Sequence, residues 1–174
     1  NVTKSLTFTG INNAAIIDNP GTGTNKVQSR VFNINANNVS LTFNDLGFKN
    51  FEKKDSNGSA VTGETGIVLN TNGKTGVTLA FNNCIFDGNK STKAGALYIN
   101  NGTVVSLTNC LFKENQAENQ GGAIHIIASN VTMTGCTFYK NKTTSTTPNL
   151  NAGAMYVNGA SSVVNVDYCT FFQN

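Results

Sequence analysis

The chain has 174 residues, of which only 12% are charged, and its formal net charge at pH 7 is +3. There are 29 Asn, 17 Gly and no Trp, a composition typical of turns, which argues against long helices. No segment approaches the ~20 consecutive apolar residues of a membrane-spanning helix, so no membrane span is expected. The weak and dispersed positive charge gives little reason to expect nucleic acid as a partner.

A repeat of about 26 residues organises most of the chain. Each copy opens with small residues, continues with two short alternations of apolar and polar residues, and ends in Cys-x-Phe-x-x-Asn. A coil of such short strands cannot bury its own apolar face, so the copies must stack, with each strand parallel to its equivalent in the next coil. The repeat therefore predicts an all-β fold, a right-handed parallel β-helix with three short strands per coil and about five to six coils.

In chain order, residues 1–28 predict at most an irregular or partial first coil, marked by Leu6, Phe8, Ile16 and Ile17. The next coil has Leu46 in place of the Cys and Phe51 in place of the Asn. Two polar stretches without apolar periodicity read as loops that leave the body, and variable loops on a rigid frame often carry binding. The whole chain, 1–174, is predicted to be one β-helix segment, with coils 29–51, 66–89, 95–115, 122–141 and 153–174 and loops 52–65 and 142–152.

The repeated motifs have a structural interpretation. Each Phe is expected to point inward and stack on the Phe of the next coil, while each Asn turns the corner and satisfies turn backbone or its neighbouring Asn. Each Gly-Ala opening fits a sharp and crowded entry into a strand. The predicted structural motif comprises Gly95, Ala96, Gly121, Gly122, Ala123, Gly153, Ala154, Phe86, Asn89, Phe112, Asn115, Phe138, Asn141, Phe171 and Asn174.

The four cysteines follow the repeat, at spacings of 26, 26 and 33 residues. Zinc ligands usually pair two to four residues apart, so this spacing indicates no metal site, and no cofactor is expected. Two interpretations remain, a buried thiol stack or disulfides formed in an oxidising compartment. The cysteines concerned are Cys84, Cys110, Cys136 and Cys169.

Candidate contact residues lie outside the apolar pattern. Tyr98, His125 and Tyr156 share one coil position and predict an outward-facing column of rings, since their apolar neighbours should face inward. Lysines gather near the loop corner, where they predict a positive rim suited to a sulfated glycan. Asp87 and Glu114 fall near one corner, but the sequence shows no convincing catalytic pair, so no catalytic residues are assigned. The candidate binding residues are Lys53, Lys54, Tyr98, His125, Lys140, Lys142, Thr146 and Pro148.

The openings GGAI (121–124), AGAL (94–97) and AGAM (152–155), together with FxxN closing four coils, resemble the repeats of the chlamydial polymorphic membrane proteins. The resemblance covers roughly residues 43–174. It implies an autotransporter with a secreted β-helical passenger and a C-terminal barrel in the bacterial outer membrane. On this basis the chain is expected to be part of a larger passenger, at the bacterial surface or secreted.

The resemblance also implies a function, adhesion to host cells through a host cell-surface protein or glycan, with no enzymatic activity. Two other functions remain open, a β-helical carbohydrate-active enzyme fragment and a structural spacer. Self-association through uncapped β-helix ends or through the cysteines is a further expectation, because solenoids need capped ends for solubility.

Overall fold

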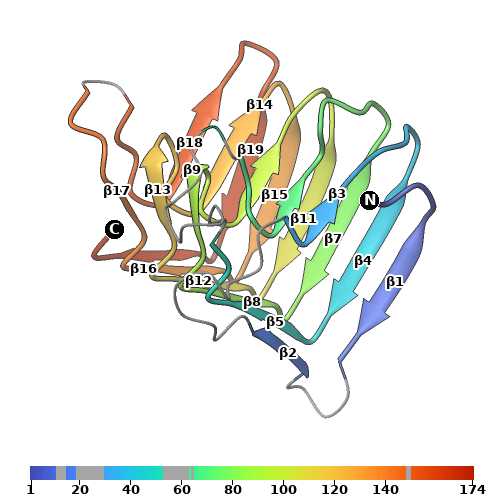
Figure 1. Cartoon of the computed structure of the whole chain (residues 1–174), viewed down its shortest axis with the longest axis horizontal. Helices are drawn as coiled ribbons and strands as arrows, with labels where there is room; N and C mark the ends of the chain where they lie inside the picture. Colours follow the sequence, from blue (N-terminus) through green and yellow to red (C-terminus); the bar gives the residue numbers. More distant parts are fainter. Residues whose placement is uncertain (11–14, 19–29, 53–62, 64, 148–149) are drawn as a thin grey trace, which may run out of the picture.

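A computed structural model of the chain describes residues 1–10, 15–18, 30–52, 63, 65–147 and 150–174. All the strand pairs in these residues are parallel, and each joins a strand to its equivalent in the next coil (Figure 1). Strands far apart in sequence thus lie side by side, and the chain winds into a parallel β-helix, as the repeat predicts.

The strands form four sheets that run along the helix axis. The first sheet contains β3 (Phe32–Asn33), β6 (Leu69–Asn70), β10 (Leu97–Ile99), β14 (Ile124–Ile127) and β18 (Met155–Asn158). The second contains β1 (Leu6–Thr9), β4 (Ser40–Asn44), β7 (Thr78–Asn82), β11 (Val104–Thr108), β15 (Asn130–Thr134) and β19 (Val163–Asp167). The third contains β2 (Ala15–Asp18), β5 (Leu46–Lys49), β8 (Ile85–Asp87), β12 (Leu111–Lys113), β16 (Thr137–Tyr139) and β20 (Thr170–Phe172). The fourth contains β9 (Lys90–Lys93), β13 (Gln116–Asn119) and β17 (Lys142–Thr143).

The irregular N-terminal coil is present. Val2 forms a parallel bridge with Ile34, β1 pairs with β4, and β2 pairs with β5. The second and third sheets therefore each have six strands, one from each coil. Residues 11–14 and 19–29 of this predicted coil lie outside the described residues.

The alternating pattern sets which side chains enter the core. In β11, Val105 and Leu107 are buried while Val104 and Ser106 are exposed, and the same alternation recurs in β15. Strict register brings equivalent residues together, so Leu107 lies beside Phe81 of the previous coil. Because adjacent strands are only about 4.8 Å apart, each apolar side chain contacts its equivalents above and below.

The Phe residues of the FxxN motif form a continuous inner stack. The ring centroids of Phe86 and Phe112 are 4.6 Å apart, those of Phe112 and Phe138 are 4.7 Å apart, and those of Phe138 and Phe171 are also 4.7 Å apart. The three pairs are parallel to within 5°. The predicted inward stacking of Phe is confirmed, and the column extends to Phe48 in the preceding coil.

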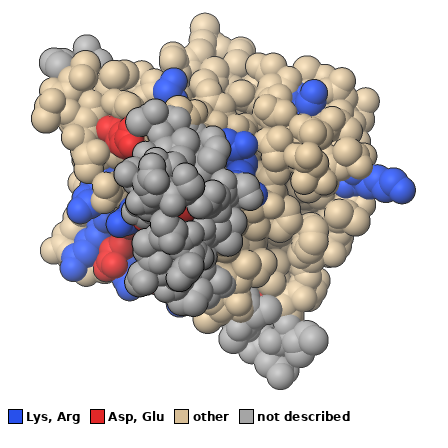
Figure 2. Space-filling view, viewed as in Figure 1, with Lys and Arg blue, Asp and Glu red and all other residues tan. Residues whose placement is uncertain are grey.

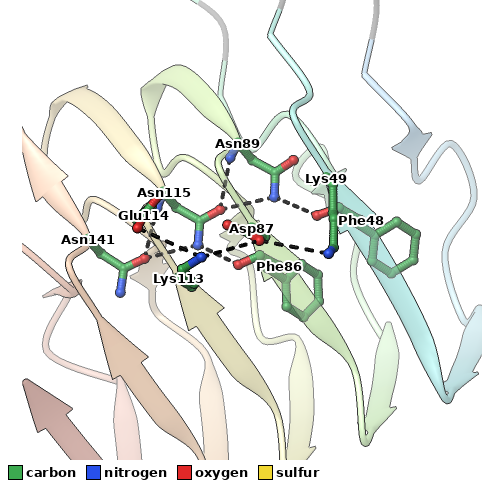
Figure 3. Close-up of polar contacts among 9 residues, drawn as sticks. All are labelled: Phe48, Lys49, Phe86, Asp87, Asn89, Lys113, Glu114, Asn115 and Asn141. Atoms are coloured by element: carbon green, nitrogen blue, oxygen red, sulfur yellow. Dashed lines mark hydrogen bonds and ion pairs between the residues drawn. The ribbon is translucent and has the colours of Figure 1, made fainter. Parts of the chain in front are cut away.

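The Asn residues of the same motif form a buried amide ladder (Figure 3). The Nδ2 of Asn89 donates to the Oδ1 of Asn115 at 3.0 Å, and the Nδ2 of Asn115 donates to the Oδ1 of Asn141 at 2.9 Å. Each amide also bonds the backbone of adjacent coils, as when the Nδ2 of Asn115 donates to the carbonyl of Phe86 at 2.9 Å. Phe51 occupies the Asn position of its coil, and its N–H donates to the Oδ1 of Asn89. The two predicted roles of the Asn, bonding backbone and bonding its neighbour, are both confirmed.

The Gly openings are required because backbone from the next coil occupies the space of a side chain. A Cβ at Gly122 would overlap the carbonyl oxygen of Gly153 and lie 2.6 Å from the amide nitrogen of Lys142. A Cβ at Gly95 would meet the carbonyl of Gly122 in the same way. The steric explanation of these glycines is confirmed.

The fourth sheet was not predicted from the sequence. Its strands lie in residues 90–94, 116–121 and 142–152, which the sequence indicated only as connections between coils. Its strands are rich in Lys, Gln, Asn and Thr and show little apolar alternation, so their pattern does not reveal them. They form because in-register stacking of the preceding Asn aligns the next residues, as in the pairing of Gln116 with Lys90 and Lys142. As a result, β17 lies inside the predicted 142–152 loop.

The cysteines are free thiols in the structure. Cys84, Cys110 and Cys136 are buried, and each donates from Sγ to a backbone carbonyl of the previous coil, as Cys110 does to Phe81 at 3.3 Å. Hydrogen bonds with the thiols of Cys136 and Cys84, followed by burial, raise the pKa of Cys110 well above its ordinary value. Of the two interpretations, a buried stack of thiols and a set of disulfides, the structure therefore has the stack of thiols. Three of the four cysteines cannot bridge to another molecule unless the coil opens.

Replacing Asn115 by Ala tests the amide ladder. The change removes the acceptor that Asn115 offers to the Asn89 amide and the side-chain donor to the Phe86 carbonyl, both in a dry interior, and we expect the free energy of unfolding to fall by about 3 kcal/mol. Chemical unfolding followed by circular dichroism measures the loss. Asn165→Ala, at an exposed position of β19, is the matched control and should change stability little. Equal stability of the two variants would contradict a structural role for the ladder.

Candidate functional site

The residues on either side of each ladder Asn face outward. Because the Asn side chain points into the core, the residue before it and the residue after it form two parallel rows on the surface. The first row has left-handed backbone in the five coils where the structure describes it, with φ of 60° at Asn50, 66° at Gly88, 54° at Glu114, 53° at Lys140 and 53° at Gln173. The second row is the start of the fourth sheet, where Lys90, Gln116 and Lys142 lie in register.

A groove of about 600 Å³ lies between these two rows. It runs along the helix axis and crosses the coils, with the third sheet on one side and the fourth on the other. A second depression of about 260 Å³ adjoins it and shares Lys142. The main groove is lined by Asn50, Gly88, Lys90, Glu114, Gln116, Lys140, Lys142 and Gln173.

The charges around the groove are unequally paired (Figure 3). The Nζ of Lys113 lies 3.8 Å from a carboxylate oxygen of Glu114 and 3.8 Å from one of Asp87, and the Nζ of Lys49 lies 3.9 Å from the same Asp87 oxygen. The lysines that line the groove differ from Lys113 and Lys49. Among the described residues, no carboxylate lies within ion-pair distance of Lys90, Lys140 or Lys142.

Lys140 is held in its charged form beside an aromatic ring. A hydrogen bond with Tyr139 raises the pKa of Lys140, and its Nζ lies 5.0 Å from the centroid of the Tyr139 ring. Tyr139 in turn stacks on Phe172, with centroids 5.6 Å apart and planes within 7°. Figure 2 shows lysine side chains gathered on the side of the molecule where Figure 1 places β16 and β17.

The aromatic column is only partly as predicted. Tyr98, His125 and Tyr156 do align, with centroids 5.0 Å apart and rings edge to face. His125, however, is 1% exposed, so the prediction that it faces solvent is wrong. Two features surround the column. The segment that enters the first sheet lies against it, since Gly66 is close to the backbone and Cβ of Tyr98. The rings of Tyr98 and Tyr156 flank His125 on either side. His125 is therefore not a surface contact.

His125 is also unsatisfied. Neither ring nitrogen has a hydrogen-bond partner in the part of the chain that the structure describes. Burial, and then the nearby charge of Lys93, lower the pKa of His125 to about 4. The neutral imidazole is thus the form that the fold accommodates.

The other predicted contact residues are scattered relative to the groove. Lys140 and Lys142 line it, and Thr146 is exposed in the segment that follows β17. Tyr98 and Tyr156 are half-buried beside His125 on the first sheet. Lys53, Lys54 and Pro148 lie outside the described residues.

Sequence reasoning placed Lys90 with Lys140 and Lys142 among the lysines near the loop corner, but it missed Gln116, Gln173 and Asn50 as lining residues. A usable signal was present, since any residue flanking an inward Asn must face outward, and the repeat then places equivalent residues in rows. What the pattern could not supply is the concave shape, because it depends on the angle between the third and fourth sheets, and the fourth sheet was itself not predicted.

The sequence model of the family described as right handed beta helix region matches residues 65–174. The chain belongs to this right-handed β-helix family. No curated protein and no solved structure matches the chain. The family establishes the fold of this β-helix, and the groove is then the feature from which its function must be argued.

The described part of this β-helix shows neither a metal-binding cluster nor a membrane-spanning helix. No group of three or more His, Cys, Asp or Glu side chains there is arranged to hold a metal ion. The same part contains no helix long and apolar enough to cross a membrane.

Replacing His125 by Phe tests its buried neutral state. Because its pKa is about 4 when folded and about 6.5 when unfolded, the unfolded chain takes up a proton first as the pH falls, and native stability is lost between these values. His125→Phe keeps a ring in the column but cannot titrate. We expect wild type to lose up to about 3 kcal/mol relative to the variant between pH 7 and pH 4, in urea unfolding at each pH. The same pH dependence in both proteins would contradict the assignment.

Proposed function

We propose that this chain is a rigid segment of a bacterial surface adhesin that binds a host-cell receptor or glycan along the groove beside the amide ladder. The observation that carries the proposal is the presence of Lys90, Lys140 and Lys142 in that groove without carboxylate partners among the described residues. Packing explains the inward residues of each coil, but it does not explain these exposed cations.

The resemblance to the chlamydial polymorphic membrane proteins supports the same function. The motif residues that carry it are present in order in successive coils, and that resemblance implies an autotransporter passenger displayed on the cell surface or secreted. Adhesion to host cells is the activity it implies. A long solenoid suits such a task, because its stacked coils present a continuous surface for binding.

The motif residues themselves act as scaffold in this proposal. Phe112 and Asn115 are fully buried, and Gly122 is in contact with backbone of the next coil. None of them offers a surface to a receptor. Their contribution to adhesion is to hold the outward rows in register.

A carbohydrate-active enzyme fragment is the alternative that the groove suggests, since Glu114 lines it and Asp87 is near. Both carboxylates are engaged with Lys113, and Asp87 also with Lys49, which favours a structural role for the pair. A structural spacer is the other alternative, and it predicts no binding by this chain.

Adhesion of coated beads tests the proposed function. Beads carrying residues 1–174 should attach to cultured epithelial cells, and soluble chain should compete, because Lys90, Lys140 and Lys142 are all among these residues. Beads carrying the heat-unfolded chain are the control. Absence of attachment would support the spacer, and cleavage of any member of a polysaccharide panel would support the enzyme.

Replacing Phe112 by Ala tests the scaffold role of the motif. The change opens a cavity in the Phe stack and should lower the free energy of unfolding by about 4 kcal/mol, with binding lost in proportion to the unfolded fraction. Circular dichroism melting and bead attachment are measured on the same preparation. Loss of attachment by a fully folded and equally stable variant would show that the motif makes direct contact.

A further inference from the structure

We infer that the groove takes a linear sulfated glycan, lying along the helix axis with its anionic groups on Lys90, Lys140 and Lys142. This inference rests on the proposed function and narrows it to one ligand class. It is drawn from the charge and the hydrogen-bonding groups that line the groove and from the aromatic pair beside Lys140.

The side chains that line the groove carry more positive than negative charge. Three lysines line the groove against one carboxylate, and that carboxylate, on Glu114, is already 3.8 Å from Lys113 on the third sheet. The remaining charge is positive, and the ammonium groups are compact donors that suit sulfate oxygens. Lys90 and Lys142 belong to coils two apart, about 10 Å along the axis, while Lys140 is on the opposite wall. Cations therefore stand on both walls at the coil of Lys140 and Lys142, and on one wall at the coil of Lys90.

Hydrogen-bonding groups lie beside the lysines. In the second row the side-chain amide of Gln116 lies between Lys90 and Lys142, and in the first row that of Gln173 follows Lys140. An amide both donates and accepts, as a sugar hydroxyl does, so these groups can orient a saccharide between its charged substituents.

The stacked pair Tyr139 and Phe172 lies next to Lys140 on the third sheet. The Nζ of Lys140 is 5.0 Å from the centroid of the Tyr139 ring, and the Phe172 ring is parallel to that ring to within 7°. A flat apolar ring next to amides and cations offers a surface for the apolar face of a sugar ring. A groove selective for charge alone would not need it.

An acidic peptide is the competing ligand, and the groove suits it poorly. Peptides are recognised through sheet-edge hydrogen bonds, through apolar pockets for side chains or, for acidic motifs, through clusters of Arg, and the cations of this groove are all Lys. Here the groove crosses the strands rather than following a free edge, and its lining residues are polar, charged or Gly.

The test is binding of the chain to heparin, to desulfated heparin and to poly-glutamate, measured by calorimetry. Lys140→Gln/Lys142→Gln removes two groove cations, and Lys4→Gln/Lys74→Gln removes the same charge from positions that do not line the groove. We expect the groove variant to bind heparin at least ten-fold more weakly than wild type while the control variant stays within two-fold. Heparin binding should also weaken steeply as salt rises from about 0.05 M to about 0.5 M.

Other outcomes would overturn the inference. Equal losses in the two double variants, or equal affinity for poly-glutamate and heparin, would show attraction by net charge and not a glycan site. Retention of affinity for desulfated heparin would show that the sulfate groups are not recognised.

Bead attachment separates this inference from the proposed function. Loss of cell attachment by the groove variant, when wild type does not bind heparin, would leave the adhesive groove standing and reject the sulfated glycan as its ligand. Attachment that the groove variant retains in full would reject the groove as the adhesive site. No attachment by wild type would reject the adhesin itself. Circular dichroism melting should show the same stability for wild type and both double variants, because the substituted side chains are exposed or at a turn.

Discussion

The buried amide ladder is the constraint on which the rest of this structure depends. An unpaired amide in a dry interior is costly, so Asn89, Asn115 and Asn141 can be buried only if each finds the next one coil along. That requirement sets the register of neighbouring coils. With the register set, the Phe rings meet face to face and the Gly openings admit the backbone of the following coil.

The same ladder separates stability from recognition. Each inward Asn places its two neighbours on the surface, so the residues that line the groove, such as Lys140 and Lys142, flank the residues that hold the fold together. In the proposed adhesin, substitution of groove residues would change the ligand with little effect on packing. Ladder residues such as Asn115 would affect binding only through the fold, as buried groups with several partners do.

Much of the fold could be predicted from particular residues. The positions of Leu46 and Phe51 as stand-ins for Cys and Asn, the inward Phe and the crowded Gly openings all follow from period and side-chain type. His125 shows the limit of this reasoning. Alternation gives the direction in which a side chain points, but it does not show that flanking rings and an entering segment bury it.

By itself, the sequence determined a stack of parallel coils, because a repeat of short amphipathic strands can bury its apolar face only against its own copies. It also determined that the FxxN and Gly-Ala motifs are scaffold. Only the tertiary structure decided that polar segments pair as the fourth sheet, that His125 is buried, and that lysines from different coils line one groove. These depend on how surfaces meet in space, and the alternation of a single strand carries no information about what covers its outer face.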